Sequence, residues 1–125
     1  MQNRRKWVKG KIERGLGNPR RAESLFLAAK DGFLSEGIPY DTALVSLELA
    51  TLYAEQGRTD ELKRLAHETL PVFASRQIHR EALAAFAFLH QAIEAERASL
   101  ELVARVAGFL KSAQNDPALK FEPPA

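Results

Sequence analysis

Residues 44–70, with the sequence LVSLELATLYAEQGRTDELKRLAHETL, show most clearly how this chain folds. Their apolar side chains recur every three or four positions, in two runs separated by one break: Leu44, Leu47 and Leu52, then Leu62, Leu65, Ala66 and Leu70. That spacing is typical of one face of an α-helix. Within the break, Gly57 is a residue that commonly ends a helix, and Thr59 is one that commonly caps the next. The stretch therefore predicts two helices joined by a tight turn.

The same periodicity extends over the rest of the chain. Two further apolar stripes have helical spacing: Leu83, Phe86, Leu89 and Ile93, then Leu100, Val103, Val106 and Leu110. Glycine and proline mark turns at residues 15–19 and 37–39, and a weaker break falls at 75–78. No segment alternates apolar and polar residues over the length of a strand. We expect an all-α protein in which residues 79–113 form two helices or one long one, and in which Pro71 kinks its helix.

Part of the sequence returns after forty residues. The motif Phe-x-Ser-x-x-Ile occurs at residues 33–38 and again at residues 73–78. A repeat of this length is typical of stacked supersecondary units, none of which can bury its apolar face alone. We therefore predict one domain of about three antiparallel helix hairpins, at residues 4–36, 40–76 and 79–113, with a tail at 114–125. In that tail, Leu119 and Phe121 are expected to fold back over the last helix.

The placing of small and aromatic residues resembles that of tetratricopeptide repeats, whose pattern runs W-x₂-L-G-x₂-Y, then A-x₃-F, then P. Residues 49–53 (LATLY) match the L-G-x₂-Y stretch, and residues 22–26 (AESLF) match A-x₃-F, where small residues let paired helices cross closely. The chain departs from the pattern in three ways. Trp7 is one place late, the closing proline is missing, and the repeat length exceeds that of the family. The resemblance covers residues 4–113 and implies an α-solenoid, a TPR-like superhelix that acts as a protein-interaction scaffold.

The resemblance also implies a groove lined by the first helix of each hairpin. When the groove positions of the family are transferred to this sequence by matching spacing, they fall on three predicted helices. The residues are Arg4, Trp7, Lys11 and Arg14 in the first, Leu44, Leu47, Thr51 and Glu55 in the third, and Leu83, Phe86, His90 and Ile93 in the fifth. A basic, aromatic entrance would lead to an apolar floor. Such a groove suits an acidic peptide or a C-terminal carboxylate, because Arg and Lys bind carboxylates and buried aromatic residues anchor interfaces. In the alternative interpretation, Leu47 and Phe86 are core residues, and the basic residues keep the first helix soluble.

Charge is unevenly distributed along the chain. The formal net charge is +2, but residues 1–21 contain eight Lys or Arg and one acid, a net +7 that leaves −5 for the remainder. Such a segment could neutralise nucleic-acid phosphates, and Trp7 could stack on a base. The sequence contains no helix-turn-helix or ribonucleoprotein motif with which to read bases. We therefore favour a solvated or partner-facing helix, and keep nucleic-acid binding as an alternative.

Catalytic and metal-binding patterns do not occur with their expected spacing. Gly15-x-Gly17 follows a predicted helix rather than a strand, which argues against a dinucleotide-binding loop. His67-Glu68 begins like the helix of a zinc protease, but Pro71 stands where the second histidine belongs. The spacing of the three histidines fits no common site, and cysteine is absent. We expect a non-enzymatic protein with no cofactor and no metal.

The ends of the chain bear on its location and its completeness. No run of about eighteen apolar residues could cross a membrane, and the basic start leads into Lys9 and Glu13 rather than an apolar signal segment. We expect a cytoplasmic protein.

No capping helix precedes the first predicted helix, whereas solenoids need capping at both ends. One alternative is therefore a C-terminal regulatory or oligomerisation segment of a longer repeat protein, and another is self-association through the first helix.

Overall fold

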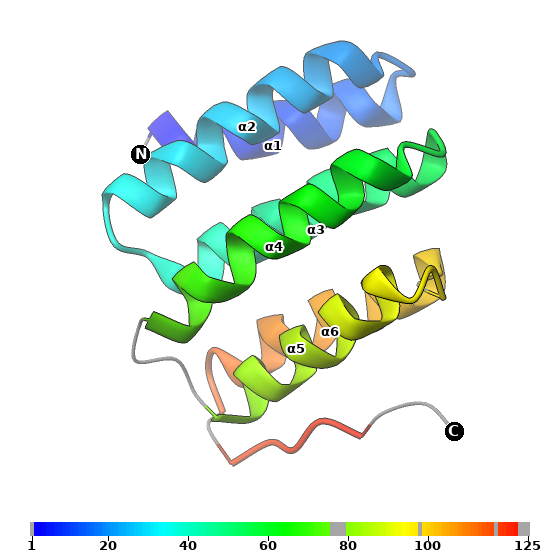
Figure 1. Cartoon of the computed structure of the whole chain (residues 1–125). Coiled ribbons are helices and arrows are strands. Elements are labelled where there is room, and N and C mark those ends of the chain that lie inside the picture. The colour runs from blue at the N-terminus through cyan, green and yellow to red at the C-terminus, as the bar shows by residue number, and fades with distance from the viewer. Residues whose placement is uncertain (1, 76–79, 98, 117, 123–125) are drawn as a thin grey trace.

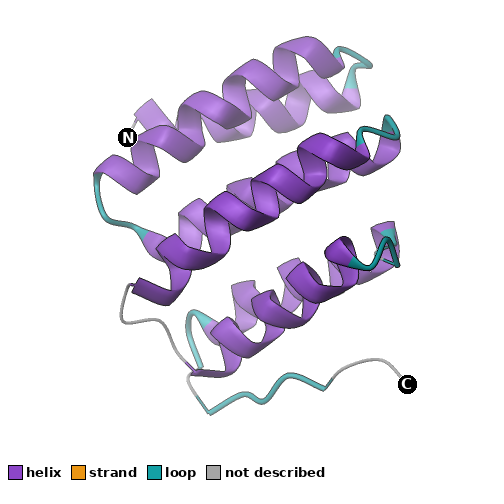
Figure 2. Ribbon diagram, in the orientation of Figure 1, coloured by secondary structure: helices purple, strands orange, loops and turns teal. Residues whose placement is uncertain are grey.

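The computed structural model describes residues 2–75, 80–97, 99–116 and 118–122. These residues form six helices and no strand (Figure 2): α1 (Gln2–Gly15), α2 (Pro19–Ser35), α3 (Pro39–Glu55), α4 (Thr59–Ser75), α5 (Arg80–Glu94) and α6 (Leu100–Ala113). The protein is therefore all-α, as predicted, and α5 and α6 are separate helices. Ile78, His79 and most of the break expected at 75–78 lie outside the described residues. No helix in the described ranges combines the length and apolarity needed to cross a bilayer.

The first three turns are alike and come at intervals of twenty residues. Gly17, Gly37 and Gly57 have positive φ angles of 80°, 71° and 69°, which glycine adopts without strain. At the third turn, the Arg58 amide donates to the Tyr53 carbonyl at 2.8 Å, which satisfies a carbonyl at the helix end. Because the turns are evenly spaced, successive helices have similar lengths, and two of them make up the forty-residue repeat.

Small residues let α1 and α2 cross closely. Ala22 of α2 is fully buried. A Cβ atom at Gly10 would come within 2.6 Å of Phe26 Cε1, and one at Gly32 would collide with the Asn3 side chain. The close crossing expected from the A-x₃-F match is thus confirmed for this pair of helices.

The helices form two layers (Figure 1). α1, α3 and α6 lie in one layer, and α2, α4 and α5 lie in the other. α3 is the central helix, packed against α2, α4 and α6, and each of residues 41–47 is buried. The third hairpin is inverted relative to the first two, because its second helix lies beside α3. A regular superhelix of equivalent hairpins would put α5 in that position.

The inversion sets which apolar faces meet. Val103, Val106 and Leu110 of α6 are buried in the same core as α3. α5 lies against α4 instead, and contributes the buried residues Ala85 and Leu89. The result is that α3 is covered by three neighbouring helices, which accounts for the long apolar run in its sequence.

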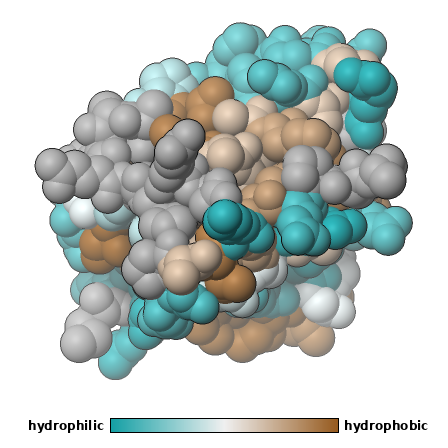
Figure 3. All heavy atoms as spheres, turned by 90° about the horizontal axis from the view of Figure 1, so that it is seen from below, coloured by the Kyte–Doolittle hydropathy of each residue, from teal (hydrophilic) through white to brown (hydrophobic). Residues whose placement is uncertain are grey.

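The tail runs along the third hairpin, as expected for Phe121. Its ring centroid lies 5.8 Å from that of Phe88 and 5.4 Å from that of Phe109. Figure 3 views the molecule from this end and shows apolar residues, in brown, between hydrophilic ones, in teal. The aromatic contacts with α5 and α6 cover part of the apolar surface that the last hairpin would otherwise expose.

Candidate partner-binding groove

A groove of about 430 Å³ lies between α1, α3 and α6. α3 forms its floor, and α1 and α6 form its walls. The lining residues are Trp7 and Arg14 from α1, Leu44, Leu47, Glu48, Thr51 and Glu55 from α3, and Leu100, Val103, Ala104, Ala107, Gly108 and Lys111 from α6. The small residues of α6 leave the space open, since a Cβ atom at Gly108 would meet nothing within 4 Å.

The floor of the groove is apolar and the single tryptophan forms one side of it. Leu44 and Leu47 are 4% and 3% exposed, so the floor belongs to the core as well as to the groove. Trp7 is 9% exposed, and its ring packs edge-on against Phe33 with 5.8 Å between centroids. The hydroxyl of Thr51 donates to the Leu47 carbonyl at 2.9 Å, within α3. An apolar side chain of a ligand would therefore meet apolar side chains that are already packed into the core.

Ion pairs between α1 and α3 cross the rim of the groove. Arg14 Nη2 lies 3.0 Å from Glu55 Oε2, and Arg14 Nη1 lies 3.9 Å from Glu48 Oε2. Lys11 Nζ lies 3.9 Å from Glu48 Oε1 and 4.7 Å from the centre of the Trp7 ring. The basic entrance expected from the sequence is thus partly neutralised by two acids of α3. Across the groove, Lys111 of α6 is exposed and forms no ion pair within the described part of the chain.

The structure brings together most of the predicted groove residues of the first and third helices. Trp7, Arg14, Leu44, Leu47, Thr51 and Glu55 line the groove, and Lys11 lines an adjoining hollow with Arg14 and Glu55. Arg4 is exposed and does not line the groove.

The predicted residues of α5 lie elsewhere. Phe86, His90 and Ile93 face α4 and the other side of α3, around a narrow cavity of about 10 Å³. Leu83 is partly buried against the core. For Phe86, the alternative interpretation as a core residue is therefore the better one. The sequence does not predict the α6 wall, because the hairpin spacing assigns that position to α5. The small residues Ala104 and Gly108, which are exposed on α6, are the one sequence signal that could have indicated it.

A second polar cluster joins α2, α4 and the end of α3. Arg58 donates from Nη1 to Glu23 Oε1 at 2.7 Å and from Nε to Glu61 Oε1 at 2.7 Å, and its guanidinium lies 4.5 Å from the Tyr53 ring centre. Hydrogen bonding to Arg58 lowers the pKa of Glu61. Burial, reinforced by the charge of Glu23, raises the pKa of Tyr53 to about 12. Since its polar groups satisfy one another, we interpret this cluster as a structural tie between the first two hairpins.

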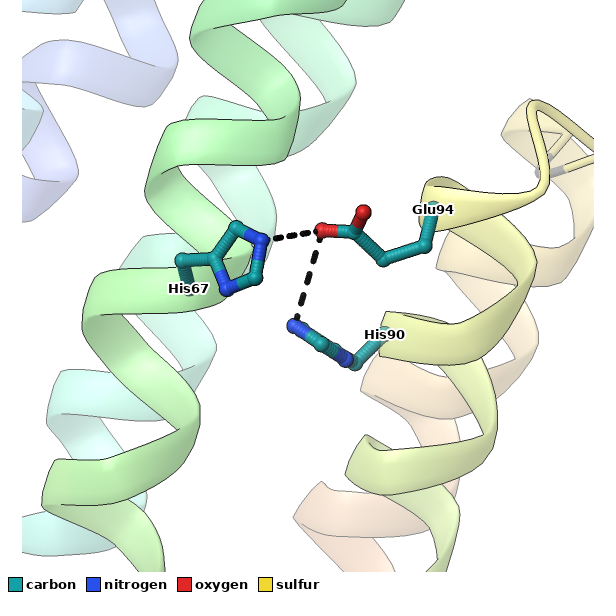
Figure 4. Close-up of side chains that lie close together, drawn as sticks. All are labelled: His67, His90 and Glu94. Carbon is teal, nitrogen blue, oxygen red and sulfur yellow. Dashed lines mark ion pairs between the residues drawn. The ribbon is translucent and has the colours of Figure 1, made fainter.

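A third cluster consists of two histidines and a carboxylate between α4 and α5 (Figure 4). His67 of α4 points toward His90 and Glu94, which lie one turn apart on α5. His67 Nε2 is 2.6 Å from Glu94 Oε1, and His90 Nε2 is 3.9 Å from the same oxygen. The sequence did not indicate this grouping, because His67 and His90 meet only through the packing of two helices from different hairpins.

No protein-family model matches this sequence, and neither the curated proteins nor the solved structures contain a chain with significant similarity to it. The resemblance to tetratricopeptide repeats therefore stays a prediction from the sequence. What the geometry establishes is a two-layer helical protein with one groove between α1, α3 and α6 and two polar clusters between helices.

Proposed function

We infer that this protein is a non-enzymatic interaction module that binds a short peptide segment of a partner protein in the α1–α3–α6 groove. The observation that carries the proposal is the groove itself, with an apolar floor, a charged rim and a volume of about 430 Å³. Ligand-binding clefts of about 300–1,000 Å³ commonly combine an apolar lining with a few polar groups that orient the ligand. The repeat resemblance supports the same proposal, because it implies a groove on the face that includes α1 and α3.

The lining residues favour binding over catalysis. None of the described residues that line the groove is a histidine, a cysteine or a serine. The Thr51 hydroxyl already donates to a backbone carbonyl, and Glu55 is held by Arg14. A nucleophile with an adjacent base, which hydrolytic and transfer reactions require, is thus not present along this lining.

The preferred partner segment carries an apolar side chain next to an acidic one. The apolar side chain would pack on Leu44, Leu47 and Val103, which form the floor and the adjacent wall. The acidic side chain would pair with Lys111, the lining cation that has no ion-pair partner among the described residues. Arg14 is a weaker candidate than the sequence suggested, because a ligand would have to displace Glu55 from it.

Blocking the groove from α6 tests this proposal. Trp7 is the only tryptophan of the chain, so its fluorescence reports on occupancy of the groove in titrations with a peptide library. We expect peptides that contain an apolar residue beside Asp or Glu to shift the emission. Gly108→Phe should abolish the shift by filling open space, and Lys111→Glu should weaken binding of the acidic peptides. Ser112→Phe, an exposed position of α6 outside the lining, is the matched control.

Two outcomes would contradict the proposal. One is unchanged peptide binding by Gly108→Phe with helical circular dichroism like that of the parent protein. The other is equal loss of binding in Gly108→Phe and Ser112→Phe, which would indicate a disturbance of α6 rather than a blocked groove. Lys111→Glu keeps the test available if the phenylalanine variant does not fold.

An apolar stripe on α1 favours self-association as a second candidate function. Val8, Ile12 and Leu16 are spaced one turn apart and are 52%, 54% and 68% exposed. The stripe is flanked by Lys9 and Arg20, so two copies would bring like charges together. We expect any dimer to strengthen with salt, and Ile12→Glu to abolish it in light scattering. A monomer at all salt concentrations would remove this candidate.

The nucleic-acid alternative gains no support from these positions. Trp7 is 9% exposed and packs against Phe33, so little of its ring is available for stacking on a base. Lys11 and Arg14 are engaged with acids of α3.

A further inference from the structure

The cluster of His67, His90 and Glu94 has the composition of a transition-metal site. One ligand atom from each residue can be chosen so that all three atoms lie within 4.8 Å of one another. In Figure 4 the two imidazole rings and the carboxylate converge on one point between α4 and α5. The centroids of the two rings are 5.1 Å apart. His90 and Glu94 are four residues apart on one helix, a spacing that places both side chains on the same face.

We propose that His67, His90 and Glu94 bind a divalent transition-metal ion, with Zn²⁺ as the ion that suits them best. Two imidazole nitrogens and one carboxylate oxygen are a known ligand set for Zn²⁺, with a water molecule in the fourth position. Mg²⁺ and Ca²⁺ prefer sites built from oxygen atoms alone. Imidazole nitrogens also suit Cu²⁺ and Ni²⁺, which serve as related probes.

Two of the three separations between the ligand atoms need only small adjustments to fit such an ion. In a tetrahedral Zn²⁺ site, bond lengths near 2.1 Å place neighbouring ligand atoms about 3.4 Å apart. The two distances to Glu94 Oε1 lie on either side of that value, 2.6 Å from His67 Nε2 and 3.9 Å from His90 Nε2. The side chain of His67 is 64% exposed, so its ring can rotate without disturbing the core.

The environment of His90 independently points to a ligand. Its Nε2 atom is buried and makes no hydrogen bond within the described residues, although it faces the other two members of the cluster. A buried polar atom without a partner is rare and costs stability. A metal ion bonded to this nitrogen would supply the missing partner, whereas the 3.9 Å separation from Glu94 is too long for a hydrogen bond.

The proposed site would connect two hairpins. His67 belongs to the second hairpin and the other two ligands belong to the third, so a bound ion would cross-link α4 and α5. An ion that binds the folded protein in preference to the unfolded chain raises stability in proportion to the logarithm of its concentration. The peptide-binding groove lies between α1, α3 and α6, so this proposal does not depend on the proposed function.

Calorimetric titration of the metal-free 125-residue chain with Zn²⁺ tests the proposal, with thermal unfolding as a second readout. We expect one ion per chain and an unfolding temperature that rises with Zn²⁺ but not with Mg²⁺. His67→Gln and Glu94→Gln should each weaken binding by at least about tenfold, since even outer-shell changes cost 10–100-fold. His79→Gln, which changes the one histidine of the sequence that is not among the three proposed ligands, is the matched control and should bind like the parent protein.

The alternative outcome is a histidine–glutamate ion pair only. It would appear as no saturable Zn²⁺ binding, or as binding that survives in the double variant His67→Gln, Glu94→Gln. Either result would overturn the proposal. His67 and Glu94 are the residues to change because both are more exposed than His90, so their variants should fold even if His90 variants do not.

Discussion

At the scale of single residues, Glu96 stands where the other turns have glycine. Its φ is 56°, in the left-handed region that favours glycine, while the equivalent turns use Gly17, Gly37 and Gly57. The hydrogen bonding is the same, because the Arg97 amide donates to the Ala92 carbonyl at 2.8 Å. A side chain in this conformation carries a steric cost that glycine does not. The third hairpin therefore contains a local strain that the first two lack.

We predict that Glu96→Gly stabilises the protein by about 1 kcal/mol, because relief of the left-handed conformation exceeds the added entropy of glycine in the unfolded chain. The ion pair of Glu96 with Lys63, at 3.6 Å, contributes little stability to oppose this gain, because the Glu96 side chain is exposed to water. The urea midpoint should rise with an unchanged slope. Gly57→Ala is the converse control and should lower the midpoint. A lower midpoint for Glu96→Gly would show that the side chain of Glu96 contributes more than its backbone costs.

At the scale of helices, the Arg58 cluster is the clearest tie between hairpins. Arg58 is the residue that follows the turn glycine, so the turn itself aims its guanidinium at Glu23 on α2 and Glu61 on α4. The planar guanidinium holds its N–H donors in a fixed fork that suits both carboxylates, whereas the ammonium of a lysine is a compact point charge without that geometry. The first hairpin is thus joined to the second by a polar contact as well as by apolar packing.

We predict that Arg58→Lys lowers the urea midpoint at pH 7 and that the loss shrinks on acidification. Hydrogen bonding to Arg58 lowers the pKa of Glu61 from its ordinary value of 4.5. A lowered pKa stabilises the folded protein above the ordinary value, and this contribution disappears as pH falls through the lowered one. The midpoints of parent and variant should therefore converge below pH 4.5. Arg5→Lys, at an exposed position of α1, is the control and should leave the urea midpoint unchanged at both pH values. A difference between the parent protein and Arg58→Lys that stays the same at low pH would contradict the role of the Arg58–Glu61 pair.

At the scale of the whole molecule, the position of α6 decides how the parts cooperate. In a linear array, stability is a sum of the single repeats and of the interfaces between neighbours, so an end repeat can unfold separately where its interface is weak. Here α6 packs directly on α3, the helix that also contacts α2 and α4. Unfolding of the last hairpin would therefore expose the centre of the core. We expect one cooperative unit rather than a chain that frays from its C-terminal end.

We predict that Leu110→Ala lowers the free energy of unfolding by about 2–5 kcal/mol, the usual cost of such a cavity at a fully buried leucine. Hydrogen exchange should show protection falling together in α2, α3 and α6, because the helices share one core. Leu100→Ala, at a position 45% exposed, should have a small effect. Loss of protection confined to α5 and α6 would contradict the cooperative arrangement.

Much of the fold could be predicted from local patterns in the sequence. Helical spacing of apolar residues located the helices, and Gly17, Gly37 and Gly57 located three of the turns, because the left-handed conformation at a helix end depends on the residue type there. The contribution of Trp7, Leu47 and Glu55 to one groove was also foreseen, since α1 and α3 both belong to the hairpins that match the repeat pattern.

Other features depended on contacts between distant parts of the chain. The placement of α6 beside α3, and with it the wall containing Gly108 and Lys111, follows from which apolar faces pack best, and helical periodicity carries no information on that choice. His67 and His90 come together for the same reason. Periodicity tells which face of a helix is buried but not which helix covers it, because several partners can bury the same stripe. Only the packing of all six helices selects one of them.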